Sequence, residues 1–471
     1  MYDIAVVGGG PGGYVAAIRA AQLGARVLLV EKEKLGGVCL NRGCIPTKTL
    51  LKSAEKWQSL QNCAAFGLRA DNIGFDFAAV MARKDQVVGQ LQAGVVQLVA
   101  GNGIEVRYGE AALTGPGTLA VSSNAGREEV AARKIIVASG SAPMKLPVAG
   151  ADLPGVLTSD EVLALDAVPR SLVVVGAGAV GVEFAAIFRA FGCQVTIVEM
   201  LPAILPSIDT DLVKRMALLL RKQGIKMLTG ARVTGIAPGP EGLTVAVATA
   251  DGKEQELAAE KVLAATGRQP SVEGIGLEAA GVAFSRKGIG VNARMETTVA
   301  GIYAVGDVTG RYMWAHAASS EGLAAAENAL GGAAEMDYGA VPGCIFTDPE
   351  IAAVGLTEQE ALAAGRLVKT GRFNFAANGK AVSMGEADGL VKVVADAGNG
   401  KVLGMHILGP HASDLVMEGA IAIRHGLTAE EIGQVIHPHP TLAETVMESV
   451  HAIEGRAIHQ ARTSSLRRGG D

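Results

Sequence analysis

Two cysteines that could do redox chemistry lie near the N-terminus, in the segment Gly36-Gly-Val-Cys39-Leu-Asn-Arg-Gly-Cys44-Ile-Pro-Thr-Lys48. The flanking glycines predict a loop at Cys39, and the apolar periodicity after Pro46 predicts a helix that begins at Cys44. A helix N-terminus stabilises a thiolate, and Lys48 adds a positive charge nearby. The C-x4-C spacing is typical of neither zinc sites nor thioredoxin motifs, so two inert cysteines are the alternative. The nucleotide-binding turn described below favours a redox-active pair.

A second segment, Ile436-His437-Pro-His439-Pro-Thr441-Leu-Ala-Glu444, carries two histidines between prolines. The prolines forbid a helix through the histidines and hold them on an extended segment. In a catalytic role, a carboxylate at Glu444 would orient and charge an imidazole that moves thiol protons. Alternatively, Thr441 and Glu444 form a capping-box pattern for the helix that follows. A two-histidine metal site would lack a nearby third ligand. Composition does not decide among these interpretations.

The elements that must position these groups include two matching units. Residues 8–13 and 176–181 are both G-x-G-x-x-G turns that follow an apolar strand and precede an Ala-rich helix. Each unit ends on an acid, Glu31 or Glu199, 23 residues after its first glycine, and eight of 24 aligned positions are identical. Such turns bring a pyrophosphate against the backbone at a helix N-terminus, while the acid binds ribose hydroxyls. The duplication predicts two bound dinucleotides.

Further strands are predicted between and after these units. Segments 135–143 and 262–270 each predict a buried strand, a glycine turn and a proline stop, and 301–307 predicts another strand before a helix over 315–330. After Pro342 the sequence pattern changes. Segments of alternating apolar and polar residues, typical of strands, come first, and helical patterns follow. We therefore place a domain boundary near Pro342.

Composition narrows the class of protein. Of 471 residues 62 are glycine, without a G-x-y period, and net charge is −5, which disfavours nucleic-acid binding. We expect no membrane span, because no apolar run reaches about 18 residues. The N-terminus does not resemble a signal peptide. Five cysteines make no disulfide scaffold, so a reducing, cytoplasmic location is expected.

Together these motifs resemble the flavoprotein pyridine-nucleotide disulfide oxidoreductases, from about Tyr2 to Gly455. The likeness also includes Ala265-Thr-Gly-Arg268 and Ala304-Val-Gly-Asp307. It implies an α/β fold with two Rossmann-like dinucleotide-binding domains and a C-terminal α+β dimerisation domain. The implied boundaries are FAD-binding 1–143 and 271–341, NAD-binding 144–270, interface 342–460, and a disordered tail 461–471.

The resemblance also implies an activity, the oxidation of protein-bound dihydrolipoamide by NAD⁺ in a homodimer with shared active sites. Cys39 would be the interchange thiol and Cys44 the thiolate beside the flavin. His439 of the partner subunit would be the acid/base, held by Glu444, so replacing His437 is expected to cost much less. Lys48 and Glu183 would pair near the flavin. The lipoyl group would come from another chain.

The cofactor-binding residues implied by the resemblance fall into two sets, and no metal is expected. The FAD set is Gly8, Gly10, Gly13, Glu31, Lys48, Ala111, Ser139, Gly140, Ser141, Asp307 and Ala315. The NAD set is Gly176, Gly178, Gly181, Glu199, Val233, Ala265, Gly267 and Arg268.

The alternative within the same fold is an NAD(P)H-dependent reductase of another disulfide, such as glutathione. An NADP site needs cations for the 2′-phosphate, whereas Glu199 would repel that group. The next cation along the chain is Lys214. The residues therefore favour NAD.

Overall fold

The structure is a computed structural model that describes residues 1–461. The tail predicted to be disordered, residues 461–471, lies outside the described residues apart from Ala461. Across the described part of the chain, no helix has the length and apolarity needed to cross a bilayer.

The first sheet combines a parallel and an antiparallel part. Its strands run in the order β3-β2-β1-β6-β5-β4, with β19 also paired to β6. The end of β6 is parallel to β1 and β19, whereas its beginning is antiparallel to β5. The bounds are β1 Tyr2–Val7, β2 Val27–Glu31, β3 Glu105–Tyr108, β4 Glu110–Gly115, β5 Thr118–Ser123, β6 Gly126–Val137 and β19 Ile302–Ala304.

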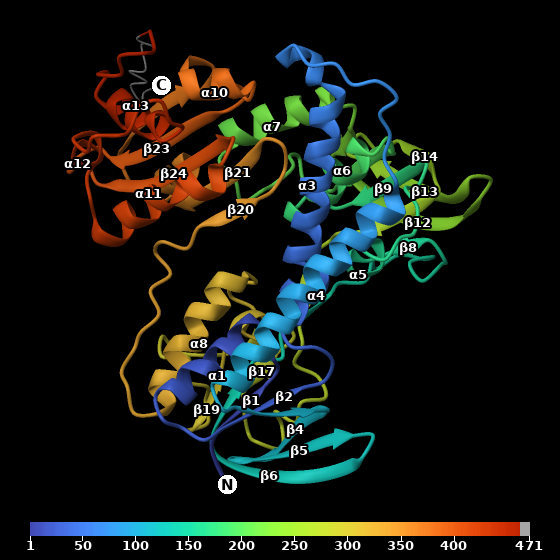
Figure 1. Cartoon of the computed structure of the whole chain (residues 1–471), viewed down its shortest axis with the longest axis vertical. Helices are drawn as coiled ribbons and strands as arrows, with labels where there is room; N and C mark the ends of the chain where they lie inside the picture. Colours follow the sequence, from blue (N-terminus) through green and yellow to red (C-terminus); the bar gives the residue numbers. More distant parts are fainter. Residues whose placement is uncertain (462–471) are drawn as a thin grey trace. The chain divides into compact units, whose positions relative to one another are not determined.

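Two helices pack against each other beside this sheet. Helix α1, Pro11–Gln22, follows the first glycine turn, and α8, Ala315–Ala329, packs against it (Figure 1). Arg19 joins them, with Nη2 2.7 Å from the Glu327 carboxylate. Gly322 allows this packing, because a Cβ there would lie 2.4 Å from the carbonyl oxygen of Gly12. The helix predicted over 315–330 is confirmed.

The second sheet repeats the strand order of the first. It runs β11-β10-β9-β15-β8, so both copies place their third, second, first and fourth parallel strands side by side. An antiparallel meander, β12-β13-β14, precedes β15. The bounds are β8 Val156–Leu157, β9 Ser171–Val175, α6 Ala179–Ala190, β10 Gln194–Glu199, α7 Thr210–Lys222, β11 Lys226–Thr229, β12 Ala231–Gly239, β13 Gly242–Thr249, β14 Glu254–Ala259 and β15 Lys261–Ala264.

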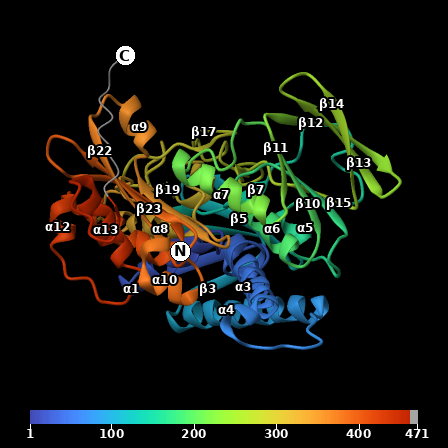
Figure 2. The same cartoon turned by 90° about the horizontal axis from the view of Figure 1, so that it is seen from above.

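Between β2 and β3 the first copy carries three α-helices, where the second copy has one. These are α2 Gly37–Arg42, α3 Cys44–Gln61 and α4 Phe77–Gly101. The long helices α3 and α4 lie side by side in both views of the chain (Figure 1, Figure 2). The second copy has only α7 at the equivalent place, so the cysteine segment is an insertion into the repeated unit.

The C-terminal part is built on an antiparallel sheet, ordered β20-β21-β24-β23-β22. Its core joins sheet residues such as Val393 and Ile407 to Val416 of α11 and Val446 of α13. The bounds are β20 Gly343–Ile345, β21 Glu350–Gly355, α9 Glu358–Ala363, β22 Val368–Asn374, α10 Gly379–Met384, β23 Leu390–Asp396, β24 Val402–Gly409, α11 Ala412–His425, α12 Ala429–Gly433 and α13 Glu444–Ile453. The predicted α/β class with a C-terminal α+β part is confirmed.

The described residues form two compact units by their internal contacts. One contains Met1–Gly176, Ala190–Gln194 and Arg232–Asp337, and the other contains Ala177–Arg189, Val195–Ala231 and the residues from Tyr338 on. The domain boundaries inferred from the sequence remain predictions.

Candidate active site

The first glycine turn leaves no room for side chains on its inner face. A Cβ on Gly8 would lie 2.3 Å from the carbonyl oxygen of Ala138, and one on Gly13 would lie 1.8 Å from that of Gly8. Glu31, which is buried, accepts from the amide of Gly9 at 2.7 Å and from that of Glu33 at 2.8 Å. The turn is therefore closed by backbone contacts and by one carboxylate.

The second turn has the same construction. A Cβ on Gly176 would lie 2.4 Å from the carbonyl oxygen of Ala265. Buried Glu199 accepts from the amides of Ala177 and Leu201, both at 2.7 Å. A Cβ on Gly178 would meet nothing within 4 Å, so neighbouring protein atoms do not explain this glycine. Open space at that position fits a ligand that approaches the backbone. Gly181 is buried in α6.

Cys39 lies on a short helix, α2, so the prediction of a loop at this cysteine is wrong. Gly36 and Gly37 adopt positive φ, 98° and 58°, which turns the chain into the helix instead of away from it. A Cβ on Gly37 would lie 2.6 Å from the Cα of Gly10, so α2 begins against the first nucleotide turn. The side-chain amide of Asn41 donates to the carbonyl oxygen of Gly37 at 2.9 Å and holds the helix.

Cys44 is the first residue of α3, as the sequence predicts. Gly43 precedes it without any side-chain cap, so Cys44 lies at the uncompensated positive end of an 18-residue helix. The hydrogen bond with Cys44 is the largest cause that raises the pKa of the Cys39 thiol, and burial is the second. The charge of Lys48, one turn along α3, acts in the opposite direction, but the pKa is raised overall. The proton is thus retained on Cys39. This geometry suits a pair in which Cys44 carries the negative charge.

Two observations within the described residues are consistent with a flavin nucleotide bound near Cys39 and Cys44. Asn41 Oδ1 is a buried oxygen without a hydrogen-bond partner, which is the kind of acceptor that a bound ligand satisfies. Helix α1 begins after Gly10 with no side-chain cap, so its first amides face the phosphate turn. Ala315 begins α8, whose N-terminus also lacks a side-chain cap, and Ala111 is a half-buried residue of β4.

Residues assigned to different cofactors meet at Ser141. Its hydroxyl donates to Asp307 Oδ2 at 2.5 Å, and Arg268 donates to the same hydroxyl at 2.7 Å and to the Ser141 carbonyl at 2.8 Å. Burial raises the pKa of Asp307 and lowers that of Arg268. Arg268, assigned to NAD by the resemblance, therefore contacts Ser141 of the predicted FAD set and acts electrostatically on Asp307, a second member of that set.

Other predicted site residues lie in loops, in β12 and in α6. Ser139 donates to the carbonyl of Ser271 at 2.8 Å, and Gly140 has a φ of 75°. Gly267 has a φ of 120°, and the side chain of Val233 is buried in β12. Glu183 is buried in α6, where Oε1 accepts from the amide of Phe346 at 2.9 Å. The pairing of Glu183 with Lys48 remains a prediction.

His439 and Glu444 form a close pair in the C-terminal part. His439 Nδ1 lies 2.8 Å from Glu444 Oε1, and the imidazole is 78 % exposed. Glu444 Oε2 accepts from the amide of Thr441 at 2.9 Å. Burial raises the pKa of Glu444, but the hydrogen bonds from Thr441 and His439 lower it overall. The carboxylate thus stays charged beside an imidazole whose Nε2 faces outward from the pair.

The predicted capping box at this helix is only half formed. Helix α13 begins at Glu444 with Ala443 as its N-cap, and no side chain caps it. Glu444 reaches back to the Thr441 amide, but the Thr441 hydroxyl donates to the carbonyl of Pro438 at 2.7 Å. The hydroxyl therefore stabilises the proline turn, and the carboxylate is shared between the turn and His439.

Sequence reasoning missed the surroundings of His437. Its Nε2 lies 3.2 Å from Glu418 Oε2 on α11, and its Nδ1 lies 2.9 Å from the carbonyl oxygen of Val435. Glu418 is 19 residues earlier on an amphipathic helix, and nothing in its local pattern marks it as a partner of a histidine.

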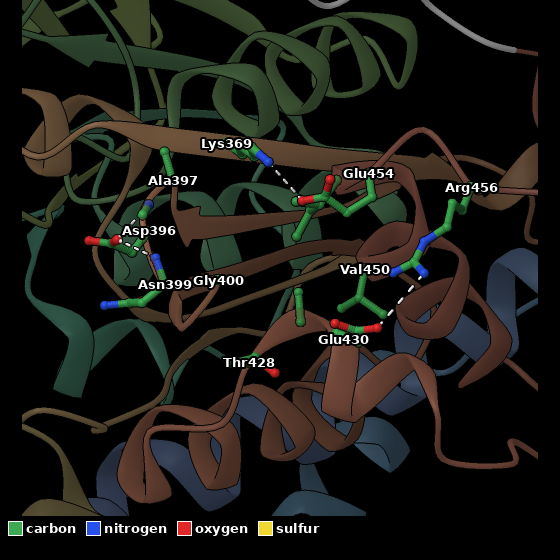
Figure 3. Close-up of a pocket in the computed structure, with 13 residues that line it drawn as sticks. Lys369, Asp396, Ala397, Asn399, Gly400, Thr428, Glu430, Val450, Glu454 and Arg456 are labelled. Atoms are coloured by element: carbon green, nitrogen blue, oxygen red, sulfur yellow. Dashed lines mark hydrogen bonds and ion pairs between the residues drawn. The ribbon is translucent and has the colours of Figure 1, made fainter.

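A hollow of about 240 Å³ lies away from these groups, between the β23–β24 turn and α12 and α13 (Figure 3). Its two cations are already paired, Lys369 with Glu454 at 2.9 Å and Arg456 with Glu430 at 3.9 Å. No residue of the predicted redox site lines it. Among residues 1–461, no three His, Cys, Asp or Glu side chains are placed together to hold a metal ion.

Family models match nearly the whole chain. Residues 2–322 match the model described as pyridine nucleotide-disulphide oxidoreductase, and residues 341–450 match the dimerisation domain of the same family. The second match supports a homodimer.

Curated relatives and solved structures agree with these matches. A dihydrolipoyl dehydrogenase of Bacillus subtilis is 43% identical over 97% of this chain and 99% of its own length. One from Thermus scotoductus is 44% identical over 97% and 98%. LpdA from Mycobacterium tuberculosis superposes with a TM-score of 0.88 at 28% identity, covering 95% of this chain and 98% of LpdA. The flavoprotein disulfide reductase RclA from Escherichia coli superposes at 0.86 with 29% identity, covering 95% and 98%.

Proposed function

Because the chain belongs to the pyridine nucleotide-disulphide oxidoreductase family, we propose that it oxidises protein-bound dihydrolipoamide to lipoamide with NAD⁺ as the acceptor. It is then a dihydrolipoyl dehydrogenase that serves 2-oxoacid dehydrogenase or glycine cleavage complexes. The observation that carries the proposal is the hydrogen-bonded pair Cys39 and Cys44 at the uncapped N-terminus of α3. We infer that this pair is the exchange site for a dithiol substrate.

The thiol exchange begins with Cys39 and Cys44 joined as a disulfide. A substrate thiolate attacks the sulfur of Cys39, which forms a mixed disulfide and releases Cys44 as a thiolate. The second substrate thiol then loses its proton and attacks the substrate sulfur of the mixed disulfide. Lipoamide leaves with its own disulfide, and two electrons remain on the cysteine pair. The helix N-terminus and Lys48 stabilise the negative charge at Cys44.

His439 and Glu444 move the protons of this exchange. The imidazole accepts the proton of the first substrate thiol at Nε2 and releases it to solvent. It then accepts the proton of the second thiol and returns it to Cys39 as that sulfur leaves, while Glu444 holds Nδ1 and stabilises the imidazolium each time. In this proposal the pair belongs to the partner subunit, so each active site needs two chains. The high exposure of His439 within one chain suits a group that completes a site elsewhere.

FAD and NAD are the cofactors of this family, and FAD supplies the step that takes the electron pair from the thiols and passes a hydride to NAD⁺. The first turn, with Gly8, Gly10, Gly13 and Glu31, would hold FAD together with Asp307 and Ser141. The second turn, with Gly176, Gly178, Gly181 and Glu199, would hold NAD. The substrate partner is a lipoyl-bearing domain of another chain. A cytoplasmic location is part of the proposal, because the chain carries only five cysteines.

A steady-state comparison tests the function. One assay supplies dihydrolipoamide with NAD⁺, and the other supplies glutathione disulfide with NADPH. We expect turnover in the first and little in the second. Faster turnover with glutathione disulfide would show that the chain is the reductase of a different disulfide.

A further inference from the structure

His437 is hydrogen bonded at both ring nitrogens. The partners of Nδ1 and Nε2 are the carbonyl oxygen of Val435, at 2.9 Å, and the carboxylate of Glu418, at 3.2 Å. Both partners are acceptors, whereas a neutral imidazole carries one N–H. Only the imidazolium donates to both. The side chain of His437 is 6 % exposed, so water does not substitute for either partner.

The charge state agrees with this geometry. The hydrogen bond to Glu418 raises the pKa of His437, although burial opposes the shift. A histidine with a raised pKa keeps its interaction below its ordinary pKa and loses it as the pH rises through the folded value. The pair between His437 and Glu418 is therefore a charge-assisted bond below the raised pKa of His437.

This bond fixes one end of the short segment that carries His439. The other end is fixed at Thr441, whose carbonyl oxygen accepts from the side-chain amide of Asn378 at 3.0 Å and whose amide donates to Glu444. Between the two anchors lie only Pro438, His439 and Pro440, and each proline ring locks its own φ. The direction of the His439 side chain is thus set by two anchors that flank it.

Charged groups from each packed element surround this segment. Glu418 comes from α11 and Glu444 from α13, while His459, which follows α13, is bound by the buried Glu448 at 2.8 Å. Both His439 and His459 act electrostatically on Glu444, and Glu444 acts on His437. The carboxylates of Glu418 and Glu444 thus both favour the charged form of His437.

We propose that the His437–Glu418 pair is a positioning device, which clamps the His439 segment onto α11 and keeps the imidazole of His439 aimed for thiol deprotonation. This inference rests on the proposed function, because it assigns His439 as the base. It is consistent with the expectation from the sequence that replacing His437 costs much less than replacing His439, and it gives that smaller cost a cause. His437 is a positioning residue, since it acts through His439 and not on the substrate.

The test compares His437→Gln, Glu418→Gln, the double variant and a control. The control is His425→Gln, which makes the same substitution at an exposed residue of α11. Each variant is assayed for dihydrolipoamide oxidation by NAD⁺ from pH 5.5 to 9 and for NADH oxidation by ferricyanide, which needs no thiol deprotonation. Flavin content and the thermal midpoint are measured on the same samples.

We expect each single variant to lose about tenfold in kcat with dihydrolipoamide, because small displacements of a catalytic group are costly. The double variant should lose no more than either single one, since both remove the same bond. The difference in kcat between the unmodified protein and His437→Gln should narrow as the pH rises through the raised pKa of His437, because the neutral imidazole no longer donates to both acceptors. Ferricyanide reduction should stay within twofold.

Three outcomes would overturn the inference. One is that His437→Gln has the same activity as His425→Gln. Another is an equal loss in the ferricyanide assay, which would indicate general damage to the fold. The third is a difference in kcat between the unmodified protein and His437→Gln that does not change between pH 5.5 and 9. If the unmodified protein does not oxidise dihydrolipoamide, the proposed function fails separately, and the same variants are compared with the disulfide that it does turn over.

Discussion

Glu31 and Glu199 make the same two hydrogen bonds, one pair in each copy of the repeated unit. Each carboxylate accepts from the amide that follows the first glycine of its turn and from the amide two positions beyond itself, at 2.7 or 2.8 Å. The internal duplication visible in the sequence therefore extends to single hydrogen bonds. Each acid is fixed where the end of its strand meets the turn.

The fixed charge of Glu199 predicts nucleotide choice. A 2′-phosphate next to a buried carboxylate is a like-charge contact that costs several kcal/mol, so NAD⁺ should exceed NADP⁺ by about 100-fold or more in kcat/KM. Glu199→Gln should narrow the ratio, and the exposed Glu278→Gln should leave it unchanged. Similar kcat/KM values for the two nucleotides in the unmodified protein would refute the assignment.

The hydrogen bond between Cys39 and Cys44 predicts distinct spectra for the two serine variants. Because the proton stays on Cys39, Cys39→Ser should show a long-wavelength thiolate–flavin absorbance without any reductant. Cys44→Ser should lose that absorbance. Cys63→Ser, away from the pair, serves as the control and should match the unmodified protein after two-electron reduction. The reverse pattern would exchange the roles of the two sulfurs.

His439→Gln should lower dihydrolipoamide oxidation by about 10²–10⁴-fold, the usual contribution of a general base. Ferricyanide reduction by NADH should be nearly unchanged, because those electrons leave without thiol deprotonation. His425→Gln controls for the substitution itself. An equal fall in both assays would mean that the histidine supports the fold and not the proton transfer.

A shared site predicts recovery when two inactive chains are mixed. Refolding Cys44→Ser with His439→Gln should give heterodimers in which one of two sites has intact cysteines and an intact histidine. With random pairing, activity should return to about a quarter of the unmodified level. Heterodimers that form, as shown by native mass spectrometry, yet stay inactive would place His439 and the cysteines of one site on the same chain.

Lys392 predicts a large effect on stability. It is fully buried, with Nζ 2.7–2.9 Å from the carboxylates of Asp209, Asp211 and Glu358. Arg372 also pairs with Asp211 and Glu358, so Lys392→Met would leave the buried carboxylate of Asp209 without its cation and should cost about 3–5 kcal/mol of unfolding free energy. Lys253→Met, which removes an exposed ion pair, should cost much less. Denaturant unfolding measures both, and equal losses would contradict the role of burial.

The same cluster is sensitive to acid. Burial raises the pKa of Asp211, but the hydrogen bond from Lys392 and nearby cations lower it overall. Its contribution is therefore present above the unfolded pKa and is lost as the pH falls through the folded value. The stability difference between the unmodified protein and Lys392→Met should shrink below about pH 4. A difference that stays constant from pH 7 to pH 3 would exclude Asp211 as the cause.

Local patterns predicted the elements that carry the chemistry. The glycine turns, their closing acids, the start of α3 at Cys44 and α8 follow from rules that act within about 30 residues. The error at Cys39 has a tertiary cause. Gly36 and Gly37 resemble loop residues, but their positive φ values serve the approach of α2 to Gly10, which lies 26 residues earlier.

Contacts between distant segments could not be predicted in this way. Lys392 meets Asp209 across 183 residues, and His437 meets Glu418 across a helix and a turn. Arg268 lies on Ser141, 127 residues away, whereas the motif alone assigns it to the other nucleotide. Side chains of ordinary type at ordinary spacing acquire these roles only when the sheets are assembled.

The contact of Gly37 with Gly10 gives the chain a mechanical property. A helix that carries one sulfur of the exchange pair rests, backbone to backbone, on the turn expected to hold the flavin pyrophosphate. No flexible side chain lies between them to absorb a displacement. We therefore expect a displacement of the turn to displace α2 and the sulfur of Cys39 with it. The position of this sulfur is thus coupled to that of the nucleotide.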